Sequence, residues 1–165
     1  MKYWVCKTTP ALVYEAMECL GGNGYVEDGS LARLYREAPV NAIWEGSGNV
    51  MALDVLRVFD RDAEASHAMV AGLEREAGDL PGVRDAAAFV ATAFAAPDVE
   101  ATACAAVERL ALLAAAAALK AGARAYVAES FARTRLLDRR GGTFGTSALG
   151  VGEISALLDR ALVLN

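Results

Sequence analysis

The chain has few of the residues that usually stabilise small secreted proteins or bind metal ions. Its 165 residues include three cysteines, Cys6, Cys19 and Cys104, which are widely spaced and form no CxxC pair. This spacing argues against a disulfide scaffold or a zinc site, and it favours reduced thiols in a cytoplasmic protein. His67 is the single histidine. We expect it to be a surface residue, and we expect no metal site.

The chain also lacks long apolar runs. Lys2 and Lys7 enclose four apolar residues, which is too few for the core of a signal peptide. The most apolar run, LALLAAAAAL at residues 110–119, is about half as long as a segment that spans a bilayer, and charged residues stand on both sides of it. We therefore expect a buried helix here and no association with a membrane.

No stretch alternates polar and β-branched residues in the way that a strand requires, whereas alanine is abundant. The sequence predicts an all-α fold. Thr9 is a plausible N-cap with Pro10 in the first helical position, so we expect a break or kink at Thr8-Thr9-Pro10. The expected helices are 2–20 with that break, 31–37, 47–60, 62–77, 82–95, 98–122, 123–138 and 153–162, with a loop at 21–30.

Two glycine-rich turns are the most informative local feature. They are Gly21-Gly22-Asn23-Gly24 and Gly46-Ser47-Gly48-Asn49, and Trp44-Glu45 stands directly before the second. Glycines let a ligand approach backbone N–H groups, and a buried glutamate beside a helix N-terminus would suit proton abstraction next to an anionic cofactor. The spacing alone also fits an ordinary helix C-cap at the first turn and a solvated glutamate at the second.

The segment 20–57 resembles the C-terminal domain of flavin-dependent acyl-CoA dehydrogenases, whose signatures are a GG-x-G-aromatic turn and an I-[YW]-E-G-[TS] turn. The resemblance implies a helical bundle, FAD as cofactor, an acyl-CoA substrate and a homo-oligomer, either a dimer or a tetramer. It places Glu45 at the position of the catalytic base, with its backbone N–H against the thioester oxygen. The cofactor-binding positions that it implies are Gly21, Gly22, Trp44, Gly46, Ser47, Gly48 and Asn49.

In the family, the first glycine turn lies against the ADP part of an FAD that is bound mainly by a neighbouring subunit. Glu18 stands where the family usually has glutamine. A carboxylate at that position would repel a pyrophosphate, so a direct role for Glu18 in binding is not expected.

A narrower resemblance points to one branch, the AidB-like dehydrogenases of the bacterial alkylation response. It rests on WEGSGN followed by VMALDVLR, on Lys2-Tyr3-Trp4, on Thr143-Phe144-Gly145-Thr146, and on the helical extension after Arg57. That branch implies binding of double-stranded DNA. Residues 120–165 carry seven basic and four acidic side chains, although the whole chain has a net charge of −5. The DNA-binding candidates are Arg124, Arg133, Arg135, Arg139 and Arg140.

Arg124, Arg135 and Arg139 would share one face of a continuous helix, since they are 11 and 4 residues apart. The alternative interpretation is a solvated helix with intramolecular salt bridges. We expect residues 1–60 to be the bundle segment and residues 61–165 to be an extension packed on it. The N-terminal helical domain and the β-domain of the family are missing, so we expect a fragment that is inactive alone and binds FAD weakly.

Overall fold

A computed structural model of the chain describes residues 1–137, 146 and 149–162. All the secondary structure in these residues is helical and none is strand, which confirms the all-α fold. The elements are α1 (Lys2–Cys19), α2 (Gly22–Tyr25), α3 (Ser30–Glu37), the 3-10 helix η1 (Ala38–Ala42), α4 (Gly48–Arg61), α5 (Ala63–Ala77), α6 (Val83–Ala95), α7 (Val99–Gly122), α8 (Ala125–Ala132), the π-helical η2 (Arg133–Leu137) and α9 (Val151–Ala161).

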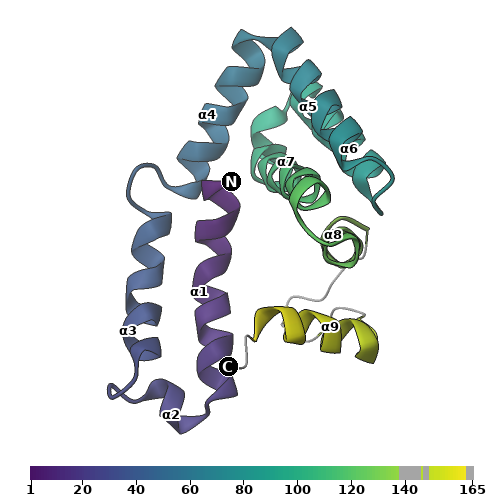
Figure 1. Ribbon diagram of the computed structural model, residues 1–165. Coiled ribbons are helices and arrows are strands. Elements are labelled where there is room, and N and C mark those ends of the chain that lie inside the picture. The colour runs from purple at the N-terminus through teal and green to yellow at the C-terminus, as the bar shows by residue number, and fades with distance from the viewer. Residues whose placement is uncertain (138–145, 147–148, 163–165) are drawn as a thin grey trace.

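The first three helices form an arm in which α1 and α3 lie side by side and α2 crosses their lower ends (Figure 1). Helix α4 leads from this arm to the helices α5, α6 and α7, which pack closely on one another (Figure 1). The expected boundary at residue 60 falls in the last turn of α4 and stays a prediction.

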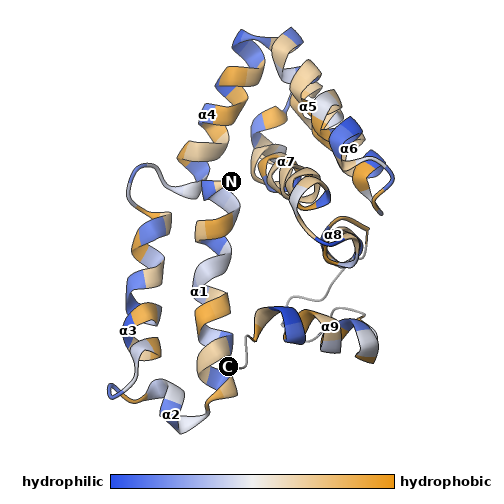
Figure 2. Cartoon of the chain, in the orientation of Figure 1, coloured by the Kyte–Doolittle hydropathy of each residue, from blue (hydrophilic) through white to orange (hydrophobic). Residues whose placement is uncertain are grey.

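Helix α7 is the centre of the core. Leu113 is fully buried on it, among apolar side chains of α5, α6 and α8 that include Val70, Val90 and Ala128. Figure 2 shows α7 as mostly apolar, and its neighbours cover much of its length. The helix is long and apolar enough to cross a membrane by composition alone, but core helices share that property. Its burial against α5 and α6 confirms the prediction of a buried helix at residues 110–119.

The predicted break at Thr8-Thr9-Pro10 is wrong, because α1 runs through Pro10 without interruption. Proline removes one backbone donor from a helix interior. The hydroxyl of Thr8 donates to the carbonyl of Trp4 at 2.9 Å, and that of Thr9 donates to the carbonyl of Val5 at 2.7 Å. Thr9 therefore lies inside the helix, where its hydroxyl bonds back to the preceding turn, and it is not an N-cap.

The predicted helix at 123–138 is also wrong in part. Helix α8 ends at Ala132, and the next five residues are π-helical. The guanidinium of Arg109 on α7 donates to the carbonyls of Arg135 and Leu136 at 3.4 and 3.1 Å, which ties this widened turn to the core. Gly82, with φ of +74°, lies against the backbone of the same segment.

The other predicted helices agree with the structure to within two residues, and the loop at 21–30 contains the four-residue helix α2. Asp62 caps α5 by accepting a hydrogen bond from the N–H of Ala65 at 3.1 Å. The expected glycine-rich loop before α9 lies largely outside the described residues.

Candidate functional site

The turn that carries Glu45 joins η1 to α4 and is tied to the start of α1. Lys2 Nζ donates a hydrogen bond to the carbonyl of Trp44 at 2.5 Å. Glu45 has φ of 55°, the one positive φ among the non-glycine residues described, and Gly46 follows with φ of 101°. A left-handed conformation costs an L-residue about 1–2 kcal/mol, so this turn holds Glu45 in an unfavourable backbone state. Such strain often accompanies function.

The side chain of Glu45 is exposed in this chain, as in the solvated arrangement that the spacing alone allows. Trp44 beside it is 60% exposed, and Ile43 is 66% exposed. A large aromatic and a carboxylate therefore project together into solvent.

Helix α4 begins directly after the turn, as the sequence predicted. Ser47 is its N-cap residue, but the hydroxyl makes no capping hydrogen bond. The first N–H groups of α4 are thus left without a side-chain cap, at the positive end of a 14-residue helix. Such an end favours an anionic group.

A groove of about 420 Å³ lies beside this helix end. Its walls are Cys6, Lys7, Pro10, Pro39, Ala42, Ile43, Ser47, Gly48 and Asn49. A Cβ on residue 48 would lie too close to the end of the Lys7 side chain, so the glycine leaves room for this lysine beside the turn. Lys7 adds a positive charge next to the uncapped helix end.

The extension packs directly behind this turn. The thiol of Cys104 on α7 donates to Asn49 Oδ1 at 3.6 Å, and the two residues are far apart in the sequence. Tyr3 lies at the same junction, where Lys7 Nζ is 5.6 Å from its ring centre. Burial, followed by the hydrogen bond with Cys104, raises the pKa of the Tyr3 hydroxyl. Sequence reasoning missed the roles of Lys7, Cys104 and Tyr3, because no local motif marks them.

The two glycine turns are not brought together. Gly21 and Gly22 follow the C-terminal end of α1, while Gly46 and Gly48 lie near its N-terminal end (Figure 1). An 18-residue helix is about 27 Å long. A Cβ at Gly21 or Gly22 would meet no atom within 4 Å, so the backbone there is open. The turns form two separate surfaces.

The uncapped start of α4, with Lys7 beside it, is suited to an anionic group such as a phosphate. At the first turn, the N–H of Gly21 donates to the carbonyl of Glu18 at 3.0 Å, so this turn offers open space beside its backbone and not a free donor at Gly21.

The continuous helix that would place Arg124 and Arg135 on one face is not formed. Arg124 is the N-cap residue of α8, whereas Arg135 lies in the π-helical segment, where the turn contains more residues. Arg133 forms an ion pair with Glu153 at 2.5 Å. Arg139 and Arg140 lie outside the described residues.

His67 is exposed on α5, as predicted. No group of three or more His, Cys, Asp or Glu side chains in the described part of the chain could hold a metal ion. The three cysteines are free thiols, and Cys6 is buried.

Comparison with known proteins finds similarity in the N-terminal third of the chain. Residues 1–59 match the acyl-CoA dehydrogenase C-terminal domain. The putative acyl-CoA dehydrogenase AidB of Escherichia coli is 61% identical over 62 residues, which are 38% of this chain and 12% of that protein. Acyl-CoA dehydrogenase family member 11 of Caenorhabditis elegans is 51% identical over 59 residues, 36% of this chain and 10% of that protein.

The bovine mitochondrial isovaleryl-CoA dehydrogenase is 39% identical over 57 residues, 34% of this chain and 13% of that protein. The similarity thus spans a small part of each relative's length, and it includes both glycine turns, Glu45 and most of α4. Over its first 59 residues, the chain is similar to the C-terminal domain of the acyl-CoA dehydrogenases.

Proposed function

We propose that this chain supplies one wall of an FAD-dependent acyl-CoA dehydrogenase site, in which Glu45 is the catalytic base. The observation that carries the proposal is the strained turn that presents Glu45 and Trp44 beside the uncapped start of α4. The other walls would come from further domains and from neighbouring subunits. The isolated chain is then inactive.

In the proposed reaction, the carboxylate of Glu45 accepts a proton from the carbon next to the thioester carbonyl. FAD, when bound, accepts the hydride that leaves the neighbouring carbon. The backbone N–H of Glu45 would donate to the thioester oxygen and stabilise the charge that develops there. Acyl substrate over the turn would exclude water from the carboxylate, which makes a carboxylate a stronger base.

The test uses a full-length parent protein that contains this chain. Glu45→Gln keeps the size of the side chain and removes the base, so FAD should still bind while reduction of the flavin by acyl-CoA slows. Loss of a positioned general base costs about a hundredfold or more. Glu76→Gln, at an exposed position on α5, is the matched control and should leave the rate unchanged. Equal rates in the two variants would refute the role of Glu45.

The chain alone should not retain FAD, because each glycine turn leaves one face of a ligand in solvent. Mixing with excess FAD, gel filtration and a flavin absorbance spectrum would measure this. Stoichiometric flavin in the protein fraction would show that the site is more complete than we propose.

The alternative is a DNA-binding module of the alkylation response with vestigial dehydrogenase chemistry. The positive balance of residues 120–165 favours it. The ion pair between Arg133 and Glu153 weakens it, because that arginine is already neutralised. Binding by the fragment should be weak, insensitive to sequence and steeply reduced by salt. Anisotropy of a labelled duplex at two salt concentrations would test this alternative.

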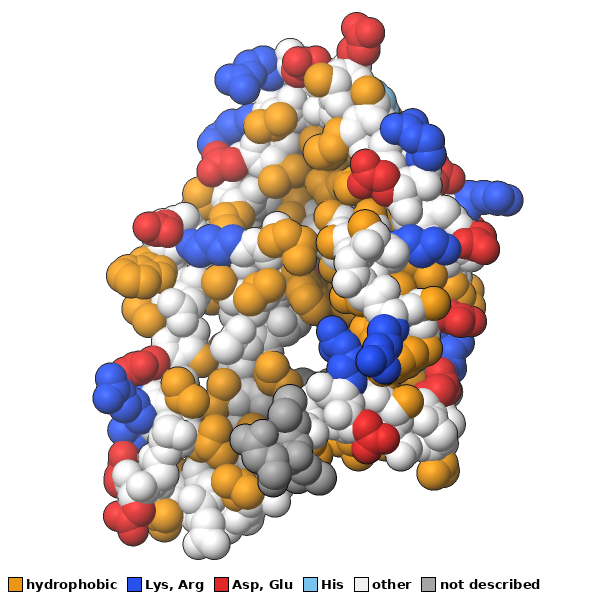
Figure 3. Space-filling model, viewed as in Figure 1, with side chains coloured by type: hydrophobic (Ala, Val, Ile, Leu, Met, Phe, Trp, Pro, Cys, Tyr) orange, Lys and Arg blue, Asp and Glu red, His pale blue; other side chains and the backbone are white. Residues whose placement is uncertain are grey.

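We also propose that the chain self-associates. Large apolar side chains are exposed along the arm and the Glu45 turn, and they include Leu12, Leu20, Tyr25, Ile43 and Trp44. Figure 3 shows apolar side chains on the surface of this part of the molecule. Exposed apolar patches of this kind usually mark an interface. The run at residues 110–119 does not contribute, because it is packed inside the core.

A further inference from the structure

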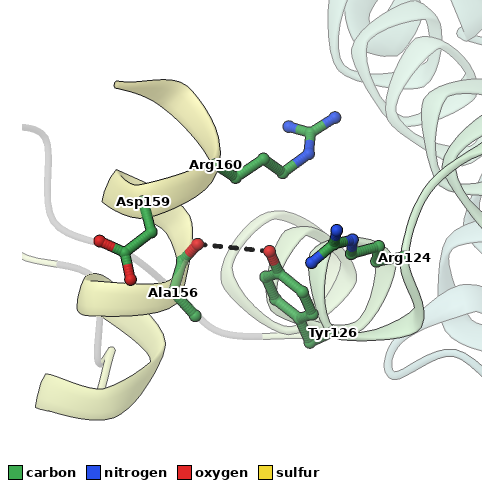
Figure 4. A pocket seen from close by; sticks show the side chains of 5 residues that line it. All are labelled: Arg124, Tyr126, Ala156, Asp159 and Arg160. Carbon is green, nitrogen blue, oxygen red and sulfur yellow. Dashed lines mark hydrogen bonds between the residues drawn. The ribbon is translucent and has the colours of Figure 1, made fainter. Parts of the chain in front are cut away.

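A pocket of about 540 Å³ lies between α8 and α9, away from the Glu45 turn. Its lining residues are Arg124, Tyr126, Ala156, Asp159 and Arg160. Arg124 precedes the first turn of α8, and Arg160 is in the last turn of α9. Figure 4 shows both arginine side chains extending into the same open space, with the ring of Tyr126 beside Arg124.

Three contacts fix α9 against α8 and so set the width of the pocket. The hydroxyl of Tyr126 donates to the carbonyl of Ala156 at 3.3 Å (Figure 4). Glu153 accepts hydrogen bonds from Arg133 at 2.5 Å and from Ser130 at 3.3 Å. The two helices are therefore joined by polar contacts at both the Tyr126 and the Glu153 positions.

The arginines near the pocket differ in whether they already form an ion pair. Arg133 is paired with Glu153, whereas Arg124 and Arg160 form no ion pair with any side chain in the described residues. Asp159 is the one carboxylate of the lining, and Figure 4 shows it pointing away from the two guanidinium groups. Two guanidinium groups thus face one pocket, and the carboxylate in its lining forms an ion pair with neither of them.

We propose that Arg124 and Arg160 bind a phosphate group. A guanidinium offers parallel N–H donors that match two oxygens of a phosphate, and two guanidiniums from different helices would grip it from two sides. The N-terminus of α8 adds positive potential at Arg124. The pocket has room for more than one phosphate group, and the Tyr126 ring provides an apolar wall for the rest of the ligand.

The phosphate would come either from a free phosphorylated compound or from the backbone of a nucleic acid. Both sources present the same charged oxygens to the arginines. Arg160 lies on a different helix from Arg124, so no spacing in the sequence indicated that the two residues meet. The site does not depend on the proposed dehydrogenase function.

The experiment is a titration of the whole ¹⁵N-labelled chain, followed by NMR of the arginine Nε–H groups. One arm adds inorganic pyrophosphate at constant ionic strength, with sodium chloride as the reference salt. The second arm adds a short DNA duplex. The variants are Arg124→Gln and Arg160→Gln, with Arg84→Gln on an exposed position of α6 as the matched control. Far-UV circular dichroism would verify that each variant is folded.

We expect saturable pyrophosphate-dependent shifts at Arg124 and Arg160. Each single substitution at these residues should weaken binding about tenfold, since a charged hydrogen-bond pair contributes roughly one such factor or more. Arg84→Gln should bind as the unmodified chain does. Competition between duplex and pyrophosphate for the two arginines would identify a nucleic acid as the source, and shifts with pyrophosphate alone would identify a free compound.

The proposal is overturned if pyrophosphate and chloride give the same shifts. It is also overturned if Arg84→Gln weakens binding as much as Arg124→Gln and Arg160→Gln do, because the effect would then be one of net charge. Neither result would bear on the role of Glu45.

Discussion

Three glycine-to-alanine substitutions should separate backbone strain from steric collision in this fold. Gly122, at the end of α7, has an ordinary φ, and an added Cβ would meet no atom within 4 Å. Gly78 has φ of +63°, and its nearest contact would be 3.9 Å away. Gly82 has φ of +74°, and its Cβ would lie 2.6 Å from the backbone nitrogen of Leu137 and 2.7 Å from the carbonyl carbon of Leu136.

The expected changes in the free energy of unfolding follow from these surroundings. Gly122→Ala should be neutral or should stabilise by up to about 1 kcal/mol, because alanine favours helix and restricts the unfolded chain. Gly78→Ala should cost about 1–2 kcal/mol for the left-handed conformation alone. Gly82→Ala adds an overpacking cost of about 1–3 kcal/mol, for a total of roughly 2–5 kcal/mol, because backbone atoms cannot rotate away.

Urea unfolding monitored by far-UV circular dichroism would measure all three variants. The order of stability should be Gly122→Ala, then Gly78→Ala, then Gly82→Ala. If Gly82→Ala lost no more stability than Gly78→Ala, the close packing of the π-helical segment on residue 82 would be wrong. Proteolysis of the segment after residue 132 should also accelerate in the Gly82 variant, because its contact with α6 is the part that is strained.

Three further predictions follow from the packing and charges. Leu113→Ala should lose about 3–5 kcal/mol in urea unfolding because the side chain is fully buried, whereas Leu158→Ala, at 50% exposed, should lose less than about 1 kcal/mol. The hydrogen bond from the Gly150 N–H, followed by the contact with Arg133, lowers the pKa of Glu153. Docking of α9 should therefore be retained above the ordinary carboxyl range and lost as the pH falls through the lowered pKa. The intensity of NMR signals from α9 would report the loss, and Arg133→Gln should move it to higher pH. Ile43→Glu and Leu12→Glu should reduce the mass measured by light scattering if the exposed apolar surface is an interface, and a monomeric unmodified chain would contradict that prediction.

Much of the helical pattern could be predicted from local signals. Asp62 and Gly78 mark the ends of α5, and Gly82 precedes α6, because caps and left-handed residues act within a few positions of the chain. Pro10 misled the prediction, since α1 continues through it and the hydroxyls of Thr8 and Thr9 bond back to carbonyls of the same helix. The π-helical segment depends on Arg109, which is 26 residues from its first contact there.

In the candidate site, too, the features set by local motifs could be predicted and those set by distant contacts could not. The glycines and Glu45 were found from motifs, because the turn needs those residue types at fixed spacing. The sequence left open whether Glu45 is buried or solvated, since burial depends on what lies opposite the turn. The positions of Lys7 and Cys104 against Gly48 and Asn49 arise from the packing of α1 and α7 on α4, and no short spacing encodes them.

The helices after residue 60 pack directly on residues 1–59 near the Glu45 turn, since α7 contacts both α1 and α4. Cys104 bonds Asn49 in the first turn of α4, and the ring of Trp4 meets Phe131 of α8 edge-on, with 6.4 Å between their centres. Tyr3 and Val107 are part of one apolar cluster around Ala52. The packing of α7 against α4 therefore contributes to the direction in which α4 points, and so to the place where its N-terminus presents Glu45. A substitution in α7 can thus move the turn without touching any residue that the family signature contains.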